Sequence, residues 1–403
     1  MSKLLGLVGP ATSGFFMSFY SELQSFPINE LNDLALQADN AAVERALSQT
    51  HPSLADFAAL ISPAAFESHL LNKIAQRAHS LTIQRFGKAI RFFAPLYLSN
   101  ECVNACKYCG FNRHNKIHRK SLNLEEVDRE MEFLYDHGFR SILLVASENP
   151  MKVSNTYLCQ CAELAAKRFS EVCFEVAPTS VEDYKNLVKA GTAGITVFQE
   201  TYIESAYGEF HPSGPKRNFQ WRLETPERAY DGGMKKLGLG VLLGLSPWQK
   251  DVIILAAHVQ FLLKHCWKAQ IGISFPRLRP HTGEFKPEHL LSDRQFVGLV
   301  CALRILFPDV AMTLSTRESP EMRNRLFPLG FTSVSAGSHT EPGGYTHESH
   351  TLGKPSEAPA TTQFEIADSR TPEEVSAFLK NLGYEPVWKD WEQSLSFTDK
   401  ASL

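Results

Sequence analysis

The chain has 403 residues and a formal net charge of −3, with 43% apolar and 21% charged residues. This length accommodates one α/β barrel with appendages or two ordinary domains. The balanced charge gives no reason to expect a nucleic-acid footprint or attraction to an anionic membrane surface. No apolar run is long enough to cross a bilayer, so we expect a cytoplasmic protein with no nucleic-acid or membrane partner.

The first 86 residues are expected to form an N-terminal extension of helices. Apolar residues recur at helical spacing over Ile28–Leu47, which predicts one helix. Ser53 is suited to cap a second helix, and Ser62-Pro63 to begin a third. A segment rich in Leu, Ile and Ala then continues as a long helix to Gly87.

From residue 87 onward, short β-type runs alternate with helical stretches. The predicted strands are Arg91–Leu98, Ser141–Ala146, Val172–Ala177, Gly194–Phe198, Gly240–Leu245, Gln270–Phe275, Val310–Ser315 and Thr332–Ser335. The predicted helices are Leu124–His137, Asn155–Phe169, Val181–Ala190, Pro226–Leu237, Lys250–His265, Asp293–Leu306, Pro320–Leu329 and Pro372–Leu382. This alternation indicates βαβ units and a parallel sheet. The leading fold is therefore an α/β (β/α)8 TIM-type barrel over 87–385, with a C-terminal tail at 386–403; an open doubly wound sheet is the alternative.

Polar residues repeatedly follow the ends of the predicted strands. In a (β/α)8 barrel the active site is built at the carboxyl ends of the strands. In strand order, the segments at these ends are Cys102–Cys109, Ser147–Asn149, Pro178-Thr179, Gln199–Thr201, Ser246-Pro247, Pro276–Arg279, Thr316–Glu318 and Ser335–Tyr345. The pattern predicts a single site at this end of the barrel.

Three of the eight cysteines, Cys102, Cys106 and Cys109, lie close together in the sequence. Cysteines this sparse do not form a disulfide scaffold, and the local cluster indicates metal binding in a reducing compartment. A structural zinc site needs four ligands, and only His114 or His118 is near enough to supply the fourth, so zinc remains an alternative. Three thiolates would instead leave one iron of a [4Fe–4S] cluster open to a bidentate ligand.

The spacing Cys102-x3-Cys106-x2-Cys109, with Tyr108 before the third cysteine, resembles the signature of the radical S-adenosylmethionine (SAM) superfamily. Further segments resemble its aromatic amino-acid lyase branch, and together they cover roughly Ser18 to Trp391. These segments are Tyr97–Cys102, Tyr108–Phe111, Asn115–Ile117, Arg119-Lys120, Phe198–Tyr202, His211–Lys216, Pro276–Pro280, Leu314–Glu318, Ser335–Ser338 and Pro342–Tyr345.

The resemblance implies a lyase that splits the Cα–Cβ bond of L-tyrosine into dehydroglycine and p-cresol, for thiazole formation in thiamine biosynthesis. It implies a [4Fe–4S] cluster on the three cysteines and SAM on its open iron, with SAM cleaved to methionine and 5′-deoxyadenosine. The implied partners are a thiazole synthase and, as electron donor, flavodoxin or ferredoxin. The basic stretch His114–Lys120 is either the docking site of the electron donor or a solvated loop. No cysteine follows Cys301, so the second cluster of the hydrogenase-maturing tyrosine lyase is not expected.

The resemblance also assigns residues to SAM. Tyr108 is expected against the adenine, Glu148 near the amino group, and Gln199 and Glu200 at the ribose. Arg222 is expected to pair with the SAM carboxylate, for which a planar guanidinium is suited. The alternatives are a packed loop aromatic for Tyr108, a helix cap for Glu148 and a surface position for Arg222.

The substrate carboxylate needs a cation, because an unpaired charge inside a barrel is costly. Arg317 is the candidate, with Ser335 assisting; its alternative is an ion pair with Glu318 or with a neighbouring loop. One of Arg277 and Arg279 is expected to hold SAM or order the cavity. Candidates for the phenol are His211, Lys216 and Tyr345.

Other functions remain open from the sequence. The tyrosine and tryptophan lyases of this branch differ in pocket residues that the sequence does not locate. Sulfur insertion of the biotin synthase kind is disfavoured because cysteines for an auxiliary cluster are missing. A zinc-bound, non-catalytic scaffold is the alternative from another class.

Overall fold

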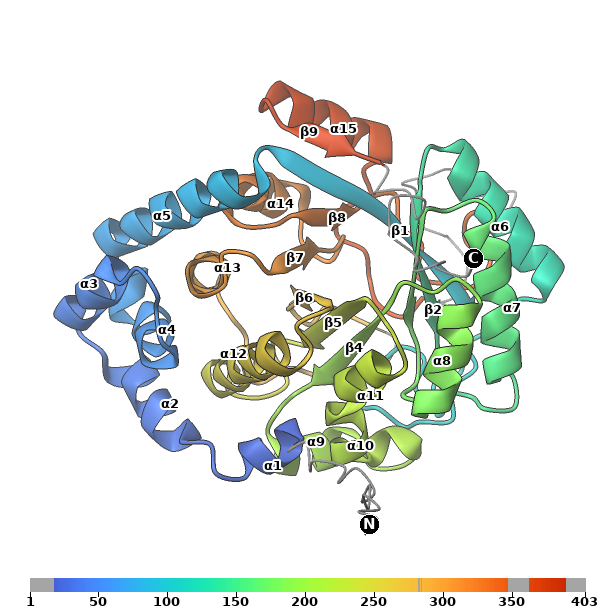
Figure 1. Ribbon diagram of the computed structural model, residues 1–403, viewed down its shortest axis with the longest axis horizontal. Coiled ribbons are helices and arrows are strands. Elements are labelled where there is room, and N and C mark those ends of the chain that lie inside the picture. Colours follow the sequence, from blue (N-terminus) through green and yellow to red (C-terminus); the bar gives the residue numbers. More distant parts are fainter. Residues whose placement is uncertain (1–17, 282, 284, 347–361, 389–403) are drawn as a thin grey trace, which may run out of the picture.

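Eight parallel strands close into a barrel in the computed structural model, which describes residues 18–281, 283, 285–346 and 362–388 (Figure 1). The strands are β1 (Ala89–Ser99), β2 (Ser141–Ala146), β3 (Glu171–Glu175), β4 (Gly194–Glu200), β5 (Lys236–Val241), β6 (Gln270–Ser274), β7 (Ala311–Leu314) and β8 (Ser333–Ser335). They pair in sequence order, and β1 closes the ring by pairing with both β8 and β2. The barrel prediction is confirmed, and the open doubly wound sheet is wrong.

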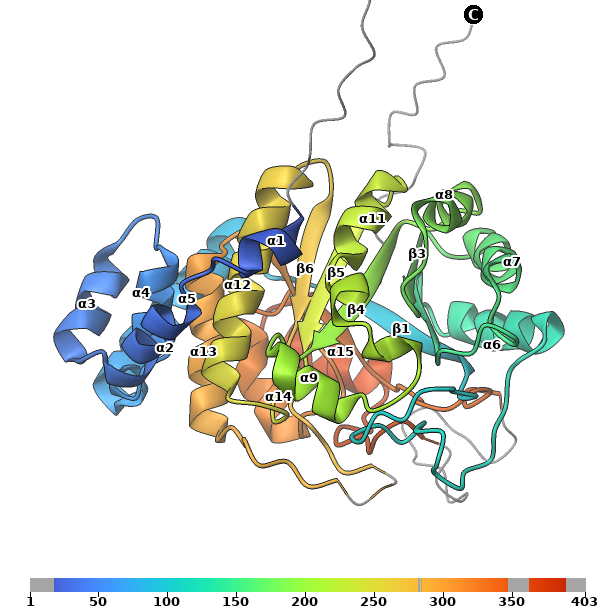
Figure 2. The same ribbon diagram turned by 90° about the horizontal axis from the view of Figure 1, so that it is seen from below.

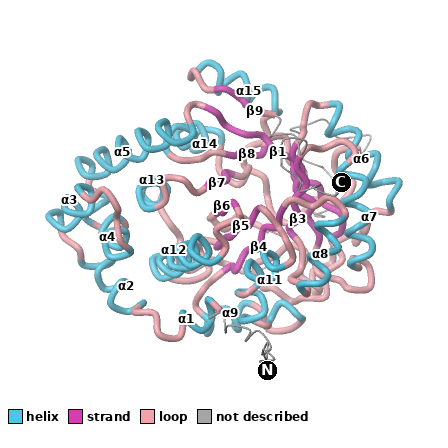
Figure 3. Tube along the Cα trace, viewed as in Figure 1, coloured by secondary structure: helices cyan, strands magenta, loops and turns pink. Residues whose placement is uncertain are grey.

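Helices ring the strands on the outside, as Figure 3 shows. The outer helices are α5 (Ser68–Phe86), α6 (Leu124–Asp136), α7 (Asn155–Ala166), α8 (Val181–Lys189), α11 (Thr225–Asp231), α12 (Trp248–His265), α13 (Asp293–Leu306) and α14 (Pro320–Leu326). Three short elements not predicted from the sequence lie between β4 and α11: α9 (Glu204–Phe210), η2 (Pro215–Arg217) and α10 (Phe219–Leu223). None of the helices in the described ranges is both long and apolar enough to span a membrane.

Strand β5 begins earlier than predicted, and the helix predicted over Pro226–Leu237 ends at Asp231. Gly233, with φ +97°, stops α11 because it adopts a conformation that other residues avoid. Glycine is also a weak strand former, which is why the predicted strand, Gly240–Leu245, begins and ends four residues later than β5. Inside the barrel it is needed, since a Cβ on Gly238 would lie 2.5 Å from the Thr196 hydroxyl.

The N-terminal extension packs outside the barrel, with α2 (Ile28–Gln37) and α4 (Leu54–Leu60) against α12 and α13 (Figures 1 and 2). The single helix predicted over Ile28–Leu47 is two helices, α2 and α3 (Asn40–Ser48). The break follows from Asp39, whose side chain accepts a 2.8 Å hydrogen bond from the Ala42 N–H and caps α3. Two further elements are α1 (Phe19–Leu23) and η1 (Ala64–Phe66).

The C-terminal segment is bound to the barrel. After α15 (Pro372–Asn381), strand β9 (Glu385–Val387) pairs with the start of β1 and so crosses the boundary expected at residue 386. The remainder of the expected tail, 389–403, lies outside the described residues, as do residues 1–17 of the extension.

Asp368 forms a fully buried ion pair with Arg323 of α14, and Arg323 also donates to the Ser335 carbonyl oxygen.

Replacing Asp368 with Ala should lower the stability of the protein markedly. Arg323 would be left as an uncompensated buried charge, which typically costs about 3–5 kcal/mol. Glu182→Ala is the control: it breaks the exposed pair with Lys185 on α8, and such pairs contribute at most about 1 kcal/mol. The measurement is the midpoint of urea unfolding. Equal midpoint shifts for the two variants would contradict the role given to the buried pair.

Candidate active site

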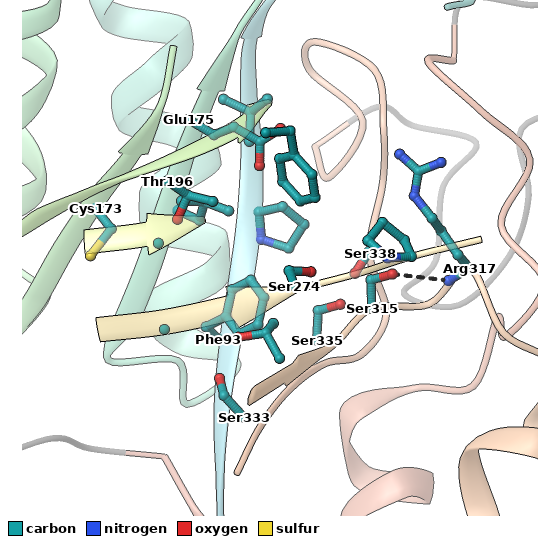
Figure 4. Close-up of a pocket in the computed structure, with 18 of the residues that line it drawn as sticks. Phe93, Cys173, Glu175, Thr196, Ser274, Ser315, Arg317, Ser333, Ser335 and Ser338 are labelled. Atoms are coloured by element: carbon teal, nitrogen blue, oxygen red, sulfur yellow. Dashed lines mark hydrogen bonds between the residues drawn. The ribbon is translucent and has the colours of Figure 1, made fainter. Parts of the chain in front are cut away.

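A cavity of about 220 Å3 lies inside the barrel. Its floor is closed by an ion pair between Arg91 of β1 and Glu171 of β3, whose N–O distance is 2.6 Å. Towards the carboxyl ends of the strands, residues of several strands and loops line it (Figure 4). The long loops that follow the strands gather at this end, as Figure 2 shows. The site predicted at this end of the barrel therefore has a cavity to act on.

The cysteine loop joins β1 to α6 and is fastened across the mouth of the barrel. Arg119 holds it from within by donating to four backbone carbonyls, among them Asn100 at 2.7 Å and Phe111 at 2.9 Å. The Gly110 N–H donates to the Gln363 carbonyl oxygen, 3.1 Å away, and a Cβ on Gly110 would lie 2.6 Å from that oxygen. Two of the five basic residues in the stretch His114–Lys120 thus have internal partners: Arg119 clamps the loop, and Lys120 forms an ion pair with Glu126.

The three cysteine thiols lie near one another. Burial raises the pKa of Cys106 to about 12, with Cys109 and Cys102 adding to the rise. Burial likewise raises the pKa of Cys109 to about 11, with Cys102 adding to the rise. Within the described ranges, no group of three or more His, Cys, Asp or Glu side chains has the arrangement that one metal ion needs. A cluster places each thiolate on a different iron, so its ligands need not converge on one point. The donor set therefore fits an iron–sulfur cluster, whose charge would also hold these buried thiols ionised.

Asn104, which was not selected from the sequence, joins the cysteine loop to its surroundings. Its side-chain N–H donates to Glu148 Oε2 at 2.7 Å, and its Oδ1 accepts from the Lys216 backbone N–H at 3.0 Å. The same amide lies 3.7 Å from the Cys102 sulfur. Glu148, predicted to meet the SAM amino group, is thereby held beside the first cysteine.

Gly214 leaves the space that Asn104 occupies. Its φ is +98°, and a Cβ there would lie 2.2 Å from Asn104 Oδ1. Gly214→Ala should therefore displace Asn104 and reduce SAM affinity about 10- to 100-fold, as loss of a supporting contact does at metal sites. Gly208→Ala is the matched control, because nothing lies within 4 Å of its Cβ position. Equilibrium dialysis with labelled SAM measures both, and unchanged affinity in Gly214→Ala would contradict the role of Asn104.

Tyr108 lines the cavity and is anchored by its hydroxyl. The Tyr108 hydroxyl lies 2.7 Å from His211 Nε2, and His211 Nδ1 lies 2.7 Å from the Tyr207 carbonyl oxygen. Because a carbonyl only accepts, Nδ1 carries the proton and Nε2 accepts from the tyrosine. Burial lowers the pKa of His211 to about 2, which keeps the imidazole neutral. His211 is thus a support for Tyr108, and its expected contact with a substrate phenol is not available in this arrangement.

Glu200 ends β4 in an unusual backbone conformation, with φ +72°. It lines the cavity and forms an ion pair with Lys216, whose Nζ is 2.7 Å from Glu200 Oε1. Its neighbour Gln199 does not line the cavity, and both polar atoms of its buried amide lack a partner within the described part of the chain. Arg222 donates from Nε to the Phe198 carbonyl oxygen at 2.6 Å. The Glu200 position predicted from the sequence therefore faces the cavity, whereas Gln199 does not.

Arg317 presents a cation to the cavity. Its guanidinium stacks on the Phe364 ring at 3.4 Å and makes no ion pair or hydrogen bond with any side chain in the described ranges. The alternative pairing with Glu318 is wrong, because Glu318 pairs with Arg277 and Arg279. Of these two arginines, Arg279 lines the cavity.

Serine hydroxyls lie on the Arg317 side of the cavity. Figure 4 shows Ser338, in the loop after β8, near Ser315, whose hydroxyl accepts from the Arg317 backbone N–H, and Ser335 of β8 farther along the same side. Ser335 is 2% exposed, and the buried Ser338 Oγ has no partner among the described residues. The arrangement of a guanidinium with nearby hydroxyls is suited to a carboxylate. Of the remaining phenol candidates, Lys216 is paired with Glu200 and Tyr345 donates to the Pro95 carbonyl oxygen at 2.8 Å.

Glu175 is a cavity residue that sequence reasoning missed. It is the last residue of β3 and lines the cavity, where Figure 4 shows it across from Arg317. Burial raises the pKa of its carboxyl to about 7, with Glu200 adding to the rise. No motif marks it in the sequence; its position as the final inward-facing residue of a strand is the one signal that points to it.

Two family models match the chain. That of the Radical SAM superfamily covers residues 96–256, and that of the Biotin and Thiamin Synthesis associated domain covers residues 274–385. The chain is 43% identical over 370 residues to 2-iminoacetate synthase of Salmonella typhimurium, covering 91% of this chain and 95% of that protein. It is 44% identical over 356 residues to 2-iminoacetate synthase of Escherichia coli, covering 88% and 92%.

Solved structures agree on the architecture. The crystal structure of HydG, a maturase of the [FeFe]-hydrogenase, matches with a TM-score of 0.83 at 32% identity, covering 92% of this chain and 80% of that one. Methylornithine synthase (PylB) matches with a TM-score of 0.68 at 17% identity, covering 86% and 97%. At that identity, the second match concerns the fold alone.

Proposed function

Because the chain belongs to the 2-iminoacetate synthase family of radical SAM enzymes, we propose that it cleaves the Cα–Cβ bond of L-tyrosine to 2-iminoacetate (dehydroglycine) and p-cresol. The observation that carries the proposal is Arg317, a partly buried residue whose guanidinium has no acidic partner in the described ranges and faces a cavity that Cys109 also lines. An amino-acid substrate brings the carboxylate that such a cation lacks.

Cys102, Cys106 and Cys109 would hold a [4Fe–4S] cluster, and SAM would bind to its open iron. When bound, the two supply a 5′-deoxyadenosyl radical that removes a hydrogen atom from the substrate amino group. Tyr108, fixed by His211, offers its ring to the adenine, and Glu148, fixed by Asn104, offers its carboxylate to the SAM amino group.

Two further basic and acidic groups complete the proposed SAM site. Arg222 is proposed for the SAM carboxylate, because only its Nε is engaged by a hydrogen bond within the described residues. Glu200 is proposed for the ribose, with Lys216 holding it in place. Gln199 is also proposed for the ribose, because its amide has no partner in the described residues. Its side chain would have to change direction to reach the cavity.

The cavity would orient the substrate and exclude water. Arg317 and Ser335 hold the tyrosine carboxylate, so that the amino nitrogen is presented to the SAM side in a fixed geometry. The apolar wall contributed by Phe93, Val145 and Leu242 keeps water from the reactive intermediates.

The product is proposed to leave as intact dehydroglycine. Residues 302–403 contain no cysteine, so they supply no thiolate for a second cluster that would degrade it further. A thiazole synthase would receive the product, and flavodoxin or ferredoxin would supply the electron. The cytoplasm fits this chemistry, because none of the eight cysteines is in a disulfide and a reducing compartment keeps thiols reduced.

An anaerobic assay with the reconstituted full chain, SAM and dithionite tests the proposal, with tyrosine and tryptophan run in parallel. The expected products from tyrosine are p-cresol and 5′-deoxyadenosine in equal amounts. Deoxyadenosine without cresol would keep the radical chemistry but remove the tyrosine assignment. Cleavage of tryptophan in preference to tyrosine would assign the chain to the tryptophan lyase activity instead.

A further inference from the structure

Glu175 is an enclosed carboxyl group that the proposed mechanism leaves without a task. It lines the barrel cavity and makes no side-chain hydrogen bond or ion pair within the described part of the chain. The other acidic group at this level, Glu200, is already paired with Lys216. An enclosed carboxylate is costly unless it is paired, so a free one facing a substrate cavity points to a group of the substrate.

The position of Glu175 relative to Arg317 narrows the choice of that group. Figure 4 shows the two side chains on facing sides of the cavity, and each one shifts the pKa of the other. The two groups form no direct ion pair, so a substrate group can lie between them. In an α-amino acid the ammonium adjoins the carboxylate and is cationic, whereas the phenol of tyrosine is neutral and lies at the far end of the side chain. With the carboxylate on Arg317, the ammonium is therefore the group that suits the Glu175 carboxylate.

We propose that Glu175 binds the α-ammonium group of the substrate and removes one proton from it, so that hydrogen-atom removal occurs from a neutral amine. The inference rests on the proposed tyrosine lyase function. In this step one N–H bond of the ammonium breaks and an O–H bond forms on a Glu175 Oε. The electron pair stays on nitrogen, and no oxidant or reductant is needed. Substrate binding and proton removal would thus be performed by one residue.

The charged and titratable groups around Glu175 come from five elements. Glu200 on β4 disfavours its ionisation; Arg317 after β7, Lys216 on η2 and Arg222 on α10 favour it; and Tyr97 lies on the β1 side. The pKa of the Glu175 carboxyl is raised to about 7, and burial is the main cause of the rise. A base with a pKa near the working pH is suited to this transfer.

Binding of two ligands separates this role from recognition of the phenol. L-tyrosine and 3-(4-hydroxyphenyl)propanoate share the carboxylate and the phenol, and only tyrosine has the amino group. The measurement uses reconstituted holoenzyme with SAM, and the cluster is left oxidised to prevent turnover. Under these conditions Glu175→Gln should weaken the binding of tyrosine about ten- to hundredfold. Affinity for the propanoate should be unchanged. Glu182→Gln, an exposed acid on α8, is the control and should change neither affinity.

The outcomes decide the inference. An equal loss of affinity for both ligands would mean that Glu175 contacts the phenol or shapes the cavity. An unchanged affinity for tyrosine would mean that Glu175 does not contact the substrate. Either result overturns the proposal. If wild-type enzyme makes no p-cresol, the proposed function itself fails. If wild-type enzyme makes cresol and Glu175→Gln makes it at the same rate, only the role of Glu175 fails.

The pH dependence gives a second, independent prediction. The base form of Glu175 is the carboxylate, whose fraction rises with pH, so the wild-type rate of deoxyadenosine formation in one turnover should fall as the pH drops through about 7. In Glu175→Gln this acid limb should move to higher pH, because water must then accept the ammonium proton. The loss near neutral pH should be about 10²-fold or more. An acid limb left in place by the substitution would contradict proton removal by Glu175.

Discussion

Cys106→Ala is expected to abolish formation of both p-cresol and 5′-deoxyadenosine. Cys106 is the most buried of the three motif cysteines, and its removal takes one of the thiolates that would hold the cluster. Without three protein ligands the open iron position is no longer defined, so both products disappear together. Iron and sulfide content after anaerobic reconstitution should fall along with activity.

A second cysteine substitution separates loss of the cluster from general damage. Cys159 lies on α7, on the outside of the barrel, and its thiol contacts Asn155. Cys159→Ala should keep iron, sulfide and both products at wild-type levels. Wild-type iron content in Cys106→Ala, or cresol formation by that variant, would contradict the assignment of the motif as the cluster site.

Arg317→Met should lower kcat/KM for tyrosine by about 10²- to 10³-fold, the loss expected when one partner of a buried charge pair is removed. Arg317→Lys should restore only part of it, since an ammonium keeps the charge but lacks the planar fork that binds two carboxylate oxygens. A matching loss of affinity should appear with the propanoate analogue, which carries the carboxylate but is not turned over because it lacks the amino group.

The effect of Arg317→Met on stability should differ from its effect on activity. In the described ranges this guanidinium has an aromatic neighbour, Phe364, and no acidic partner. Removing an unpaired, partly buried charge should leave the urea midpoint unchanged or raise it, in contrast to Asp368→Ala. If Arg317→Met lowered stability as far as Asp368→Ala does, Arg317 would be a structural residue and the substrate assignment would be wrong.

The barrel itself was predictable from the sequence because its signals are local. The alternation of short apolar runs with helical periodicity identified all eight barrel strands, and Ser141–Ala146 and Asp293–Leu306 match the structure residue for residue. Failures occurred where packing outweighs propensity. The glycines of β5 read as a helix end, although close contact with Thr196 and Phe198 requires them. Asp39 divided one predicted helix into two by capping.

The site was predictable where a motif marks it and not elsewhere. The cysteines, Tyr108, Glu200 and Arg317 come from recognisable segments and lie at or around one cavity. Asn104 and Glu175 are single polar residues without a motif, and their importance depends on neighbours far away in the sequence, such as Lys216 and Arg317. Gln363 likewise contacts the cysteine loop, through a hydrogen bond from Gly110, although the two residues are far apart in the sequence.

The central claim is that the three motif thiolates carry an iron–sulfur cluster with one iron open to SAM. Metal and sulfide analysis of the anaerobically reconstituted full chain, with the electron paramagnetic resonance spectrum of the reduced form recorded with and without SAM, tests it most directly. We expect about four iron and four sulfide per chain and a spectrum that changes when SAM is added. Zinc as the bound metal, or a spectrum indifferent to SAM, would contradict the account.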